Sequence, residues 1–350
     1  MEIIFAKEEK PTDKHTITVE QVDREIVVSG IRPTGDLHLG NYFGALRNFV
    51  KMQEQHHCFF FIADYHSLTT HPTPLNLQQN VKQILIEYLA SGIDPEIATL
   101  YVQSDLPETA ELYLFLNMNA YLGELERCAT FKDKVRQQPD NVNAGLLTYP
   151  SLQAADILIH KADKVPVGKD QQAHLELTRV FATRFNRLYQ VEYFKEPQAY
   201  NFDAELVKIP GLDGSTKMGK SDGNAIYLND LPDVIHKKIM RAKTDAGPTE
   251  ENQPKSQEII NLFTLMKHVS PPDAYAFFEH AYNNCSIRYG DLKKQLAADV
   301  IQFCTPIRER INELAKDEAY LEKVMRNGAE KARASGAKTL SEVRQIIGFK

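Results

Sequence analysis

The chain has 350 residues, of which 43% are apolar and 25% are charged, and its formal net charge is −6. This length allows about two domains, and no run of about 18 apolar residues exists, which excludes a membrane-spanning helix. The acidic balance argues weakly against a protein that coats nucleic acid. The first residues also lack the apolar core of a signal peptide, so we expect a cytoplasmic protein.

The four cysteines are scattered and form no Cys-x-x-Cys clamp, so we expect no structural metal and mostly reduced, buried thiols. Residues 1–24 are predicted to be an N-terminal extension that could form a hairpin. From Glu25, short apolar runs alternate with amphipathic runs, which is typical of an α/β fold with a parallel, Rossmann-like sheet. The predicted strands are 25–30, 58–63, 99–103 and 165–168, and the predicted helices are 42–55, 75–91 and 170–189.

The second half of the sequence has few strand-like runs. It predicts helices at 256–268, 272–282, 289–315 and 319–334. We therefore divide the chain into the extension 1–24, a catalytic domain at 25–206, and a region at 207–350 that combines a connecting segment with helices. Ligands of open parallel sheets bind beyond the carboxyl ends of the strands, where the motifs described next are placed.

The first motif runs from Gly30 to Asn41 and reads Gly-Ile-Arg-Pro-Thr-Gly-Asp-Leu-His-Leu-Gly-Asn. A strand, a glycine turn and a helix that starts near Asn41 would leave backbone N–H groups free to bind an anion. Asp36 stands where a P-loop has its lysine, which excludes a Walker site. The Gly-x-Gly pair of a dinucleotide fingerprint is also missing.

Two side chains of the first motif, those of His38 and Asn41, can donate hydrogen bonds to one anion without taking up a proton. Gly40 and Gly44 would let a nucleotide approach closely. The alternative is that His38 only caps the helix or packs against it.

The second motif is Lys217-Met218-Gly219-Lys220-Ser221. Its two lysines are three residues apart and would point to one side of a helical turn. Two ammonium groups so placed suit a developing pyrophosphate. A Lys-x-x-Lys pair is also common on solvated faces, so the pair alone does not decide between these interpretations.

Together the motifs resemble the HIGH and KMSKS signatures of class I aminoacyl-tRNA synthetases. The ending Gly40-Asn41 resembles the bacterial-type tryptophanyl-tRNA synthetases in particular, and the resemblance extends over nearly the whole chain from about Glu25. It implies that tryptophan is activated by ATP with Mg²⁺ and then transferred to tRNA(Trp). Gly219 departs from the family's usual serine, but both lysines and Ser221 remain.

The resemblance implies a role for each of two groups of residues. The catalytic residues would be His38, Asn41, Lys217 and Lys220. The ATP-binding residues would be Arg32, Pro33, Thr34, Gly40, Asn41, Gly44, Gly168, Asp170, Gln171 and the second motif, Lys217, Met218, Gly219, Lys220 and Ser221. Asp170 could equally be a plain helix N-cap. Lys132 or Lys134 could reach the phosphates or belong to a solvated charge run.

A third segment, 145–159, predicts a helix that is apolar almost all round and therefore buried. Asp156 lies within it, and a buried carboxylate is costly unless it is paired. In the resembling family this Asp accepts the indole N–H; the alternative is an Asp satisfied by nearby backbone. The full set of expected tryptophan-binding residues is His66, Tyr149, Gln153, Asp156, Val165 and Val167.

The resemblance also implies a homodimer and a helical C-terminal region that binds the anticodon side of the tRNA. Its basic stretch Lys237-Lys238-x-x-Arg241-x-Lys243 could contact phosphate or simply face solvent. Three alternatives remain at this stage: a tyrosyl-tRNA synthetase, a small adenylyltransferase, and a non-catalytic paralogue that binds tRNA or regulates.

Overall fold

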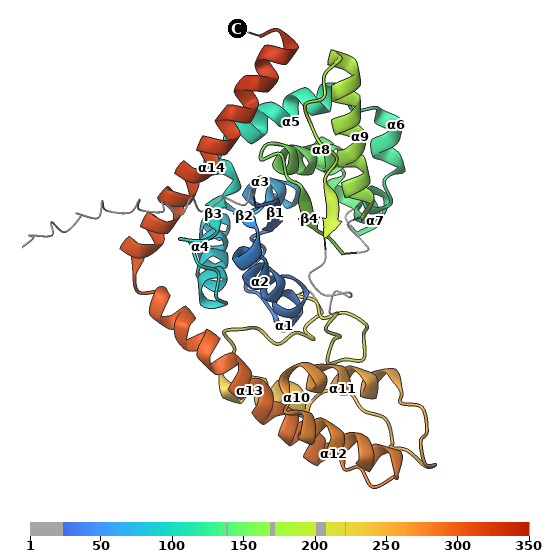
Figure 1. The fold of residues 1–350 in the computed structure, drawn as a ribbon. Helices are drawn as coiled ribbons and strands as arrows, with labels where there is room; N and C mark the ends of the chain where they lie inside the picture. The colour runs from blue at the N-terminus through green and yellow to red at the C-terminus, as the bar shows by residue number, and fades with distance from the viewer. Residues whose placement is uncertain (1–23, 138, 169–171, 201–207, 221, 350) are drawn as a thin grey trace, which may run out of the picture.

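A five-stranded parallel sheet forms the centre of the upper body in Figure 1, as the alternating sequence pattern predicts. The computed structural model describes residues 24–137, 139–168, 172–200, 208–220 and 222–349. The strand order is β3-β2-β1-β4-β5, and every pair of neighbours is parallel. The strands are β1 Ile26–Ile31, β2 His57–Ile62, β3 Thr99–Val102, β4 Lys164–Pro166 and β5 Gln198–Tyr200.

The sheet is covered on both faces because alternate residues of its buried strands enter two different apolar clusters. Val27 and Phe60 pack on one face against α2 (Arg47–Gln55) and α4 (Pro74–Ala90). Val28 and Phe59 pack on the other face. The helices there are α5 Glu108–Met118, α8 Ala144–Leu158 and α9 Gln172–Tyr189. The α/β prediction is therefore confirmed.

The helix after β1 starts earlier than predicted and is not regular. It begins as α1, Leu39–Asn41, with His38 as its N-cap, continues through the π-helical turn Tyr42–Leu46, and becomes α2. The strand β5, the helix α5 and the helix at Pro232–Met240 were not predicted from the sequence. Shorter unpredicted elements connect the strands and long helices. These are α3 Asp64–Ser67, α6 Leu122–Arg127, α7 Ala129–Gln137 and 3₁₀ turns at Leu68–Thr70, Gln103–Asp105 and Pro139–Asn141.

The second half is helical, as predicted, and all of it except the last helix forms the lower body in Figure 1. Its helices are α10 Pro232–Met240, α11 Gln257–Val269, α12 Pro272–Asn283, α13 Tyr289–Leu314 and α14 Glu318–Ile347. The prediction that the last helix ends at residue 334 is wrong, because α14 continues to Ile347. None of the helices in the described ranges is both long and apolar enough to span a membrane.

Helix α14 returns from the lower body and packs across the edge strand β3 and helix α5 (Figure 1). Gly328 makes this close approach possible, since a side chain at that position would overlap the carbonyl of Leu100. The helix thereby covers an exposed sheet edge. The proposed domain boundary near residue 206 lies outside the described residues, and the division stays a prediction.

Candidate active site

The candidate polar residues follow the carboxyl ends of adjacent parallel strands. The first motif follows β1, His66 follows β2, Gln103 follows β3 and Gly168 follows β4. Since parallel strands all end at the same edge of the sheet, these segments are brought together there. The edge is thus where the site is built.

The first motif forms a turn that is held by other parts of the chain. Gly35 has a φ of 101°, a conformation that favours glycine. Leu39 donates its backbone N–H to Ile226 at 2.9 Å, and Asn41 donates its backbone N–H to His38 at 2.8 Å. The expectation of a helix start with freely available N–H groups is therefore wrong for these two residues. Side chains must supply more of the anion binding than the sequence predicted.

The Asn41 side chain is oriented by the turn itself. Its Oδ1 accepts a hydrogen bond from the backbone N–H of His38 at 3.1 Å. An amide that accepts through its oxygen has its NH₂ group left to donate. Asn41 therefore acts as part of the turn and also presents a neutral donor.

His38 is buried and neutral at physiological pH. Its side chain is only 6% exposed, and its Nδ1 has no hydrogen-bond partner among the described residues. Burial, with smaller contributions from Lys220 and Lys217, lowers the pKa of His38 to about 4. A side chain on Gly40 would come within 2.9 Å of the His38 ring, so glycine there makes room for the imidazole. The expected donor is present with a free ring nitrogen.

The described part of the second motif, residues 217–220, lies in a loop and is not helical, which corrects the predicted helical turn. Met218 is 1% exposed and donates its N–H to Ile209 at 3.0 Å, so it anchors the loop in the core. Lys220 donates from Nζ to the carbonyl of Gly35 at 2.6 Å, whereas Lys217 is exposed. The two lysines therefore differ: one contacts the first motif and the other extends from the surface.

Asn224 organises this loop, a role that sequence analysis missed although the residue follows the motif closely. It is 3% exposed, and its Oδ1 accepts from the N–H of Gly219 at 2.9 Å. Its Nδ2 donates to Asp213 at 3.0 Å and to Ser215 at 2.8 Å. A Cβ atom at Gly219 would lie 2.5 Å from the Asp222 carboxylate. The glycine thus accommodates the local position of Asp222.

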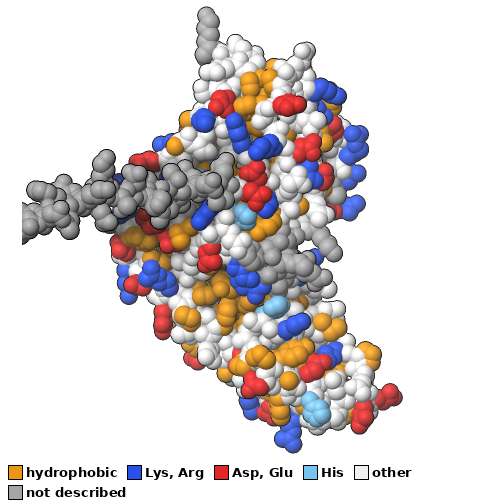
Figure 2. All heavy atoms as spheres, viewed as in Figure 1, with side chains coloured by type: hydrophobic (Ala, Val, Ile, Leu, Met, Phe, Trp, Pro, Cys, Tyr) orange, Lys and Arg blue, Asp and Glu red, His pale blue; other side chains and the backbone are white. Residues whose placement is uncertain are grey.

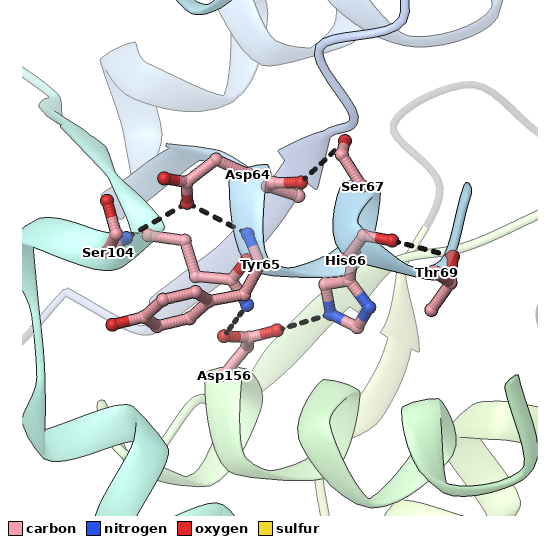
Figure 3. A network of polar contacts seen from close by, with 9 residues as sticks. Asp64, Tyr65, His66, Ser67, Thr69, Ser104 and Asp156 are labelled. Carbon is pink, nitrogen blue, oxygen red and sulfur yellow. Dashed lines mark hydrogen bonds and ion pairs between the residues drawn. The ribbon is translucent and has the colours of Figure 1, made fainter. Parts of the chain in front are cut away.

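Asp156 is the centre of a buried network on α8 (Figure 3). It is 1% exposed; its Oδ2 is 2.9 Å from His66 Nε2, and its Oδ1 accepts from Gln103 Nε2 at 2.7 Å. Burial raises the pKa of Asp156, which its bonds to His66 and Gln103 partly oppose. The alternative of a carboxylate satisfied by nearby backbone does not describe these contacts, because both partners are side chains from other elements.

A second carboxylate fixes the segments that carry these partners. Asp64 Oδ1 accepts from the backbone N–H groups of Tyr65 and Ser104, each at 3.0 Å (Figure 3). It thereby joins the residues beside His66 to those beside Gln103. Gln103 was absent from the sequence-based site, but its place directly after a buried strand was the signal that could have identified it.

The other expected pocket residues surround this network in different ways. The Tyr149 hydroxyl is 2.6 Å from His174 Nε2, and Val165 and Val167 are both buried. Gln153 is half-buried. A cavity of about 320 Å³ adjoins the network. It is lined by Tyr65, His66, Leu68, Thr69, Ala110, Tyr113, Asn143, Gly145, Thr148, Tyr149 and Leu152. His66 and Tyr149 therefore line this cavity, and His66 connects it to Asp156.

The remaining expected ATP-binding residues are less closely gathered. Arg32 is half-buried, burial lowers its pKa, and it donates to Thr70 Oγ1 at 3.5 Å. Thr34 is exposed and lies 3.4 Å from Lys220 Nζ. Pro33 is buried, Gly44 lies in the π-helical turn, Gly168 is half-buried and Lys132 is exposed. Asp170, Gln171, Ser221 and the Lys134 side chain lie outside the described residues.

Comparison with known proteins places the chain among close relatives. The family model of class I tRNA synthetases (W and Y) matches residues 21–305. A tryptophan–tRNA ligase of Porphyromonas gingivalis is 64% identical over 93% of this chain and 100% of its own length. One of Clostridium perfringens is 40% identical over 93% of this chain and 98% of its own length. The crystal structure of a Campylobacter jejuni tryptophanyl-tRNA synthetase, complexed with ADP and tryptophan, matches with a TM-score of 0.83. It is 35% identical and covers 93% of this chain and 100% of its own.

Proposed function

The chain belongs to the bacterial tryptophanyl-tRNA synthetases, which are class I tryptophan–tRNA ligases, and from this premise we propose which residues perform the reaction. The enzyme activates tryptophan with ATP and transfers the activated amino acid to tRNA(Trp). In the first step a carboxylate oxygen of tryptophan bonds to the α-phosphorus of ATP. The bond to the bridging oxygen breaks, and pyrophosphate leaves with its electron pair.

The phosphates would be bound where the two motifs meet. Lys220 donates a hydrogen bond to the carbonyl of Gly35 in the first motif. The charges of Lys220 and Lys217 both contribute to lowering the pKa of His38. This proximity is the observation that carries the assignment. Mg²⁺ would arrive with ATP as part of the substrate and would share the phosphate charge with the two lysines.

Catalysis would depend on position and charge rather than on a general base, because the attacking carboxylate is already ionised. Neutral His38 and the amide of Asn41 would donate hydrogen bonds to the reacting phosphate. Lys217 and Lys220 would stabilise the charge that develops on pyrophosphate. We assign ATP binding to the full set named above from the sequence.

Tryptophan would be recognised by the network around Asp156. Its carboxylate is held by His66 and Gln103, so an indole N–H would meet an acceptor whose direction is already fixed. Phenylalanine offers no such donor, and tyrosine would place its hydroxyl elsewhere. A site that is built to bind a polar group rejects analogues that leave its own group unpaired. We propose that Tyr149, Gln153, Val165 and Val167 complete the pocket.

The helical region at 207–350 would bind the anticodon side of tRNA(Trp). Acidic and basic side chains are interspersed on the face in Figure 2, so contact with the phosphate backbone would rely on local basic groups. Within the basic stretch, Lys238 donates to Asp230 at 2.6 Å and Lys243 pairs with Glu258 at 2.9 Å. Lys237 and Arg241 are exposed and are the better candidates.

We also propose a homodimer that works in the cytoplasm, where tRNA charging serves translation. Apolar side chains that would suit a second subunit stay exposed on α5 and at the start of α6. Examples are Leu114, Met118, Tyr121 and Leu122, which are between 48% and 77% exposed. Sedimentation of the purified protein at several concentrations tests this assembly, and a monomer at every concentration would contradict it.

Tryptophan-dependent ATP–pyrophosphate exchange tests the proposed site function, with tyrosine and phenylalanine as controls. We expect exchange with tryptophan alone, followed by charging of tRNA(Trp). A preference for tyrosine would overturn the role given to Asp156. No exchange by clean, folded protein would favour a non-catalytic paralogue.

A further inference from the structure

Glu87 is a fully buried carboxyl group that the mechanism above does not use. It lies near the end of α4, is 0% exposed, and has buried apolar neighbours on the same helix at Ile84, Leu85 and Tyr88. A carboxyl group in such surroundings is costly unless it is hydrogen-bonded. We therefore expect Glu87 to accept a hydrogen bond from a nearby donor, which an apolar residue at this position could not do.

The carboxyl group of Glu87 bonds to the turn that carries the first motif. Its Oε2 accepts from the backbone N–H of Leu37 at 2.9 Å, and its Oε1 accepts from Gln83 Nε2 at 3.1 Å. Leu37 is itself 0% exposed and directly precedes His38. Without Glu87, a buried backbone donor beside His38 would lose this acceptor.

Glu87 adds to the support that the segment after the second motif gives to this turn. The carbonyl of Leu37 accepts from the N–H of Leu228 at 3.0 Å, and residue 38 forms an antiparallel bridge with Tyr227. The segment after the second motif therefore holds one side of the turn. The carboxyl group on α4 accepts from the Leu37 N–H, so the residue before His38 is held through both its N–H and its carbonyl.

The charge of Glu87 also acts on the second motif. Burial raises the pKa of Glu87 to about 8; Asp36 raises it further, while Gln83, Leu37 and Lys220 oppose the shift. Burial lowers the pKa of Lys220, and the charges of Glu87 and Asp36 partly oppose this because they favour the ammonium form. An ionised Glu87 would thus attract Lys220 toward the position where it bonds to Gly35.

We propose that Glu87 is a positioning residue of the adenylation site, which fixes the turn that presents His38 and controls how firmly Lys220 is held against that turn. This inference rests on the proposed function of the two motifs. A neutral Glu87 leaves Lys220 available to the phosphates of ATP. As the pH rises through the titration of Glu87, the carboxylate competes with the phosphates for Lys220, and activation slows.

Two substitutions separate the acceptor from the charge. Glu87→Gln keeps an oxygen that can accept from Leu37 but cannot ionise, whereas Glu87→Leu removes both properties. Gln53→Leu is the matched control: Gln53 is also a buried polar residue with backbone partners, which it contacts at Gly92 and Asp94, each at 2.9 Å. These contacts lie away from both motifs.

The measurement is tryptophan-dependent ATP–pyrophosphate exchange from pH 6 to pH 9.5. For Glu87→Leu we expect kcat to fall about tenfold relative to Gln53→Leu, with tryptophan affinity within twofold of wild type. Glu87→Gln should stay within threefold of wild type at pH 7 and lose the decline centred near pH 8.

A Glu87→Leu enzyme with the kcat of Gln53→Leu would overturn the positioning role, and a wild-type pH profile in Glu87→Gln would overturn the control of Lys220. If Glu87→Leu does not fold, the profile of Glu87→Gln decides alone. An inactive wild-type protein would instead contradict the proposed function, and this inference would fail with it.

Discussion

The two halves of the candidate site are built differently. Around Asp156, both carboxylate oxygens have side-chain partners, and the helix that carries Asp156 lies inside the sheet's apolar cover. Around His38, the ring nitrogen Nδ1 and the Arg32 Nε are buried without partners among the described residues. The carboxylate at the centre of the amino-acid half is thus already paired, although Gln103 Oε1 beside it is buried without a partner among the described residues. In the phosphate half, by contrast, two side-chain nitrogen atoms are buried and unpaired within the described ranges.

This difference suggests a division of labour between binding and chemistry. A pre-formed network binds a substrate at little reorganisation cost. A site assembled by contact between a turn and a loop can strengthen its contacts as charge develops in the transition state. We therefore expect substitutions around Asp156 to change the affinity for tryptophan. Substitutions around His38 and the second motif should change the rate of adenylation.

The largest expected effect is that of Lys217→Ala. Removing one donor that stabilises the charge developing in a transition state typically costs about 10²–10³-fold in kcat. The exposed Lys217 side chain is not required for packing. Steady-state exchange kinetics measure this loss. Equal losses in kcat and in tryptophan binding would refute a role confined to the transition state.

Asp156→Asn should have the next largest effect, on the other half of the site. The amide keeps the shape of the side chain but has an NH₂ group in place of one oxygen. Because His66 and Gln103 each donate to one carboxylate oxygen, the NH₂ group would face a donor in place of an acceptor. We expect tryptophan affinity to fall roughly 10–100-fold, or about 1.4 kcal/mol per factor of ten. Calorimetry with ATP alone should show an unchanged affinity. Parallel loss of both ligands would make Asp156 structural.

A smaller effect on rate is expected from Asn224→Ala. This substitution removes the side chain that links the second motif to the residues that precede it in the same loop. We expect kcat to fall about threefold to tenfold. Asn224 makes hydrogen bonds to Gly219, Asp213 and Ser215, each worth about 1 kcal/mol, and only part of that loss would reach the transition state. Asn186→Ala is the matched control: Asn186 donates to Phe194 at 2.8 Å and accepts from Tyr193 at 3.1 Å and Phe194 at 3.0 Å. If both variants slow exchange equally, Asn224 has no special link to the motif.

The smallest expected effect is that of pH on the protonation of His38 over the working pH range. Because burial holds its pKa near 4, the ring should stay neutral between pH 5.5 and pH 8 in the free protein. The unfolded chain would take up a proton below about pH 6.5. The neutral folded ring therefore contributes stability that is present above that pH and lost as the pH falls toward 4. NMR titration of the His38 ring checks this, and a midpoint near 6.5 would contradict it.

Sequence analysis placed four of the five strands, the sheet type and most long helices correctly, because short apolar runs and glycine turns are local signals, but it missed the short edge strand β5 and the helices α5 and α10. It also brought His66 to Asp156, since both belong to segments that the parallel-sheet rule places together. It missed Glu87 because a single polar residue in a buried helix has no periodic signature; only the distant Leu37 explains it. The prediction of a helical turn around Lys217 is wrong because Met218 is buried in the core and anchors the loop there.

The end of the last helix shows the same limit. The pair Ser335-Gly336, which is unfavourable inside a helix, follows residue 334. The helix nevertheless continues, with buried positions at Leu340 and Val343, and is stabilised by packing on β3 and α5. Most helical stability in proteins comes from such packing rather than from intrinsic preference. Contacts between distant segments therefore account for most of the differences from the predictions.

The most direct test of the division between the two halves is tryptophan binding by Lys217→Ala. The chain contains no tryptophan, so fluorescence excited beyond the absorption of tyrosine comes from the ligand alone. We predict a dissociation constant within twofold of wild type, although adenylation is severely slowed. A loss of affinity that matches the loss of rate would contradict the division of the site into a binding half and a chemical half.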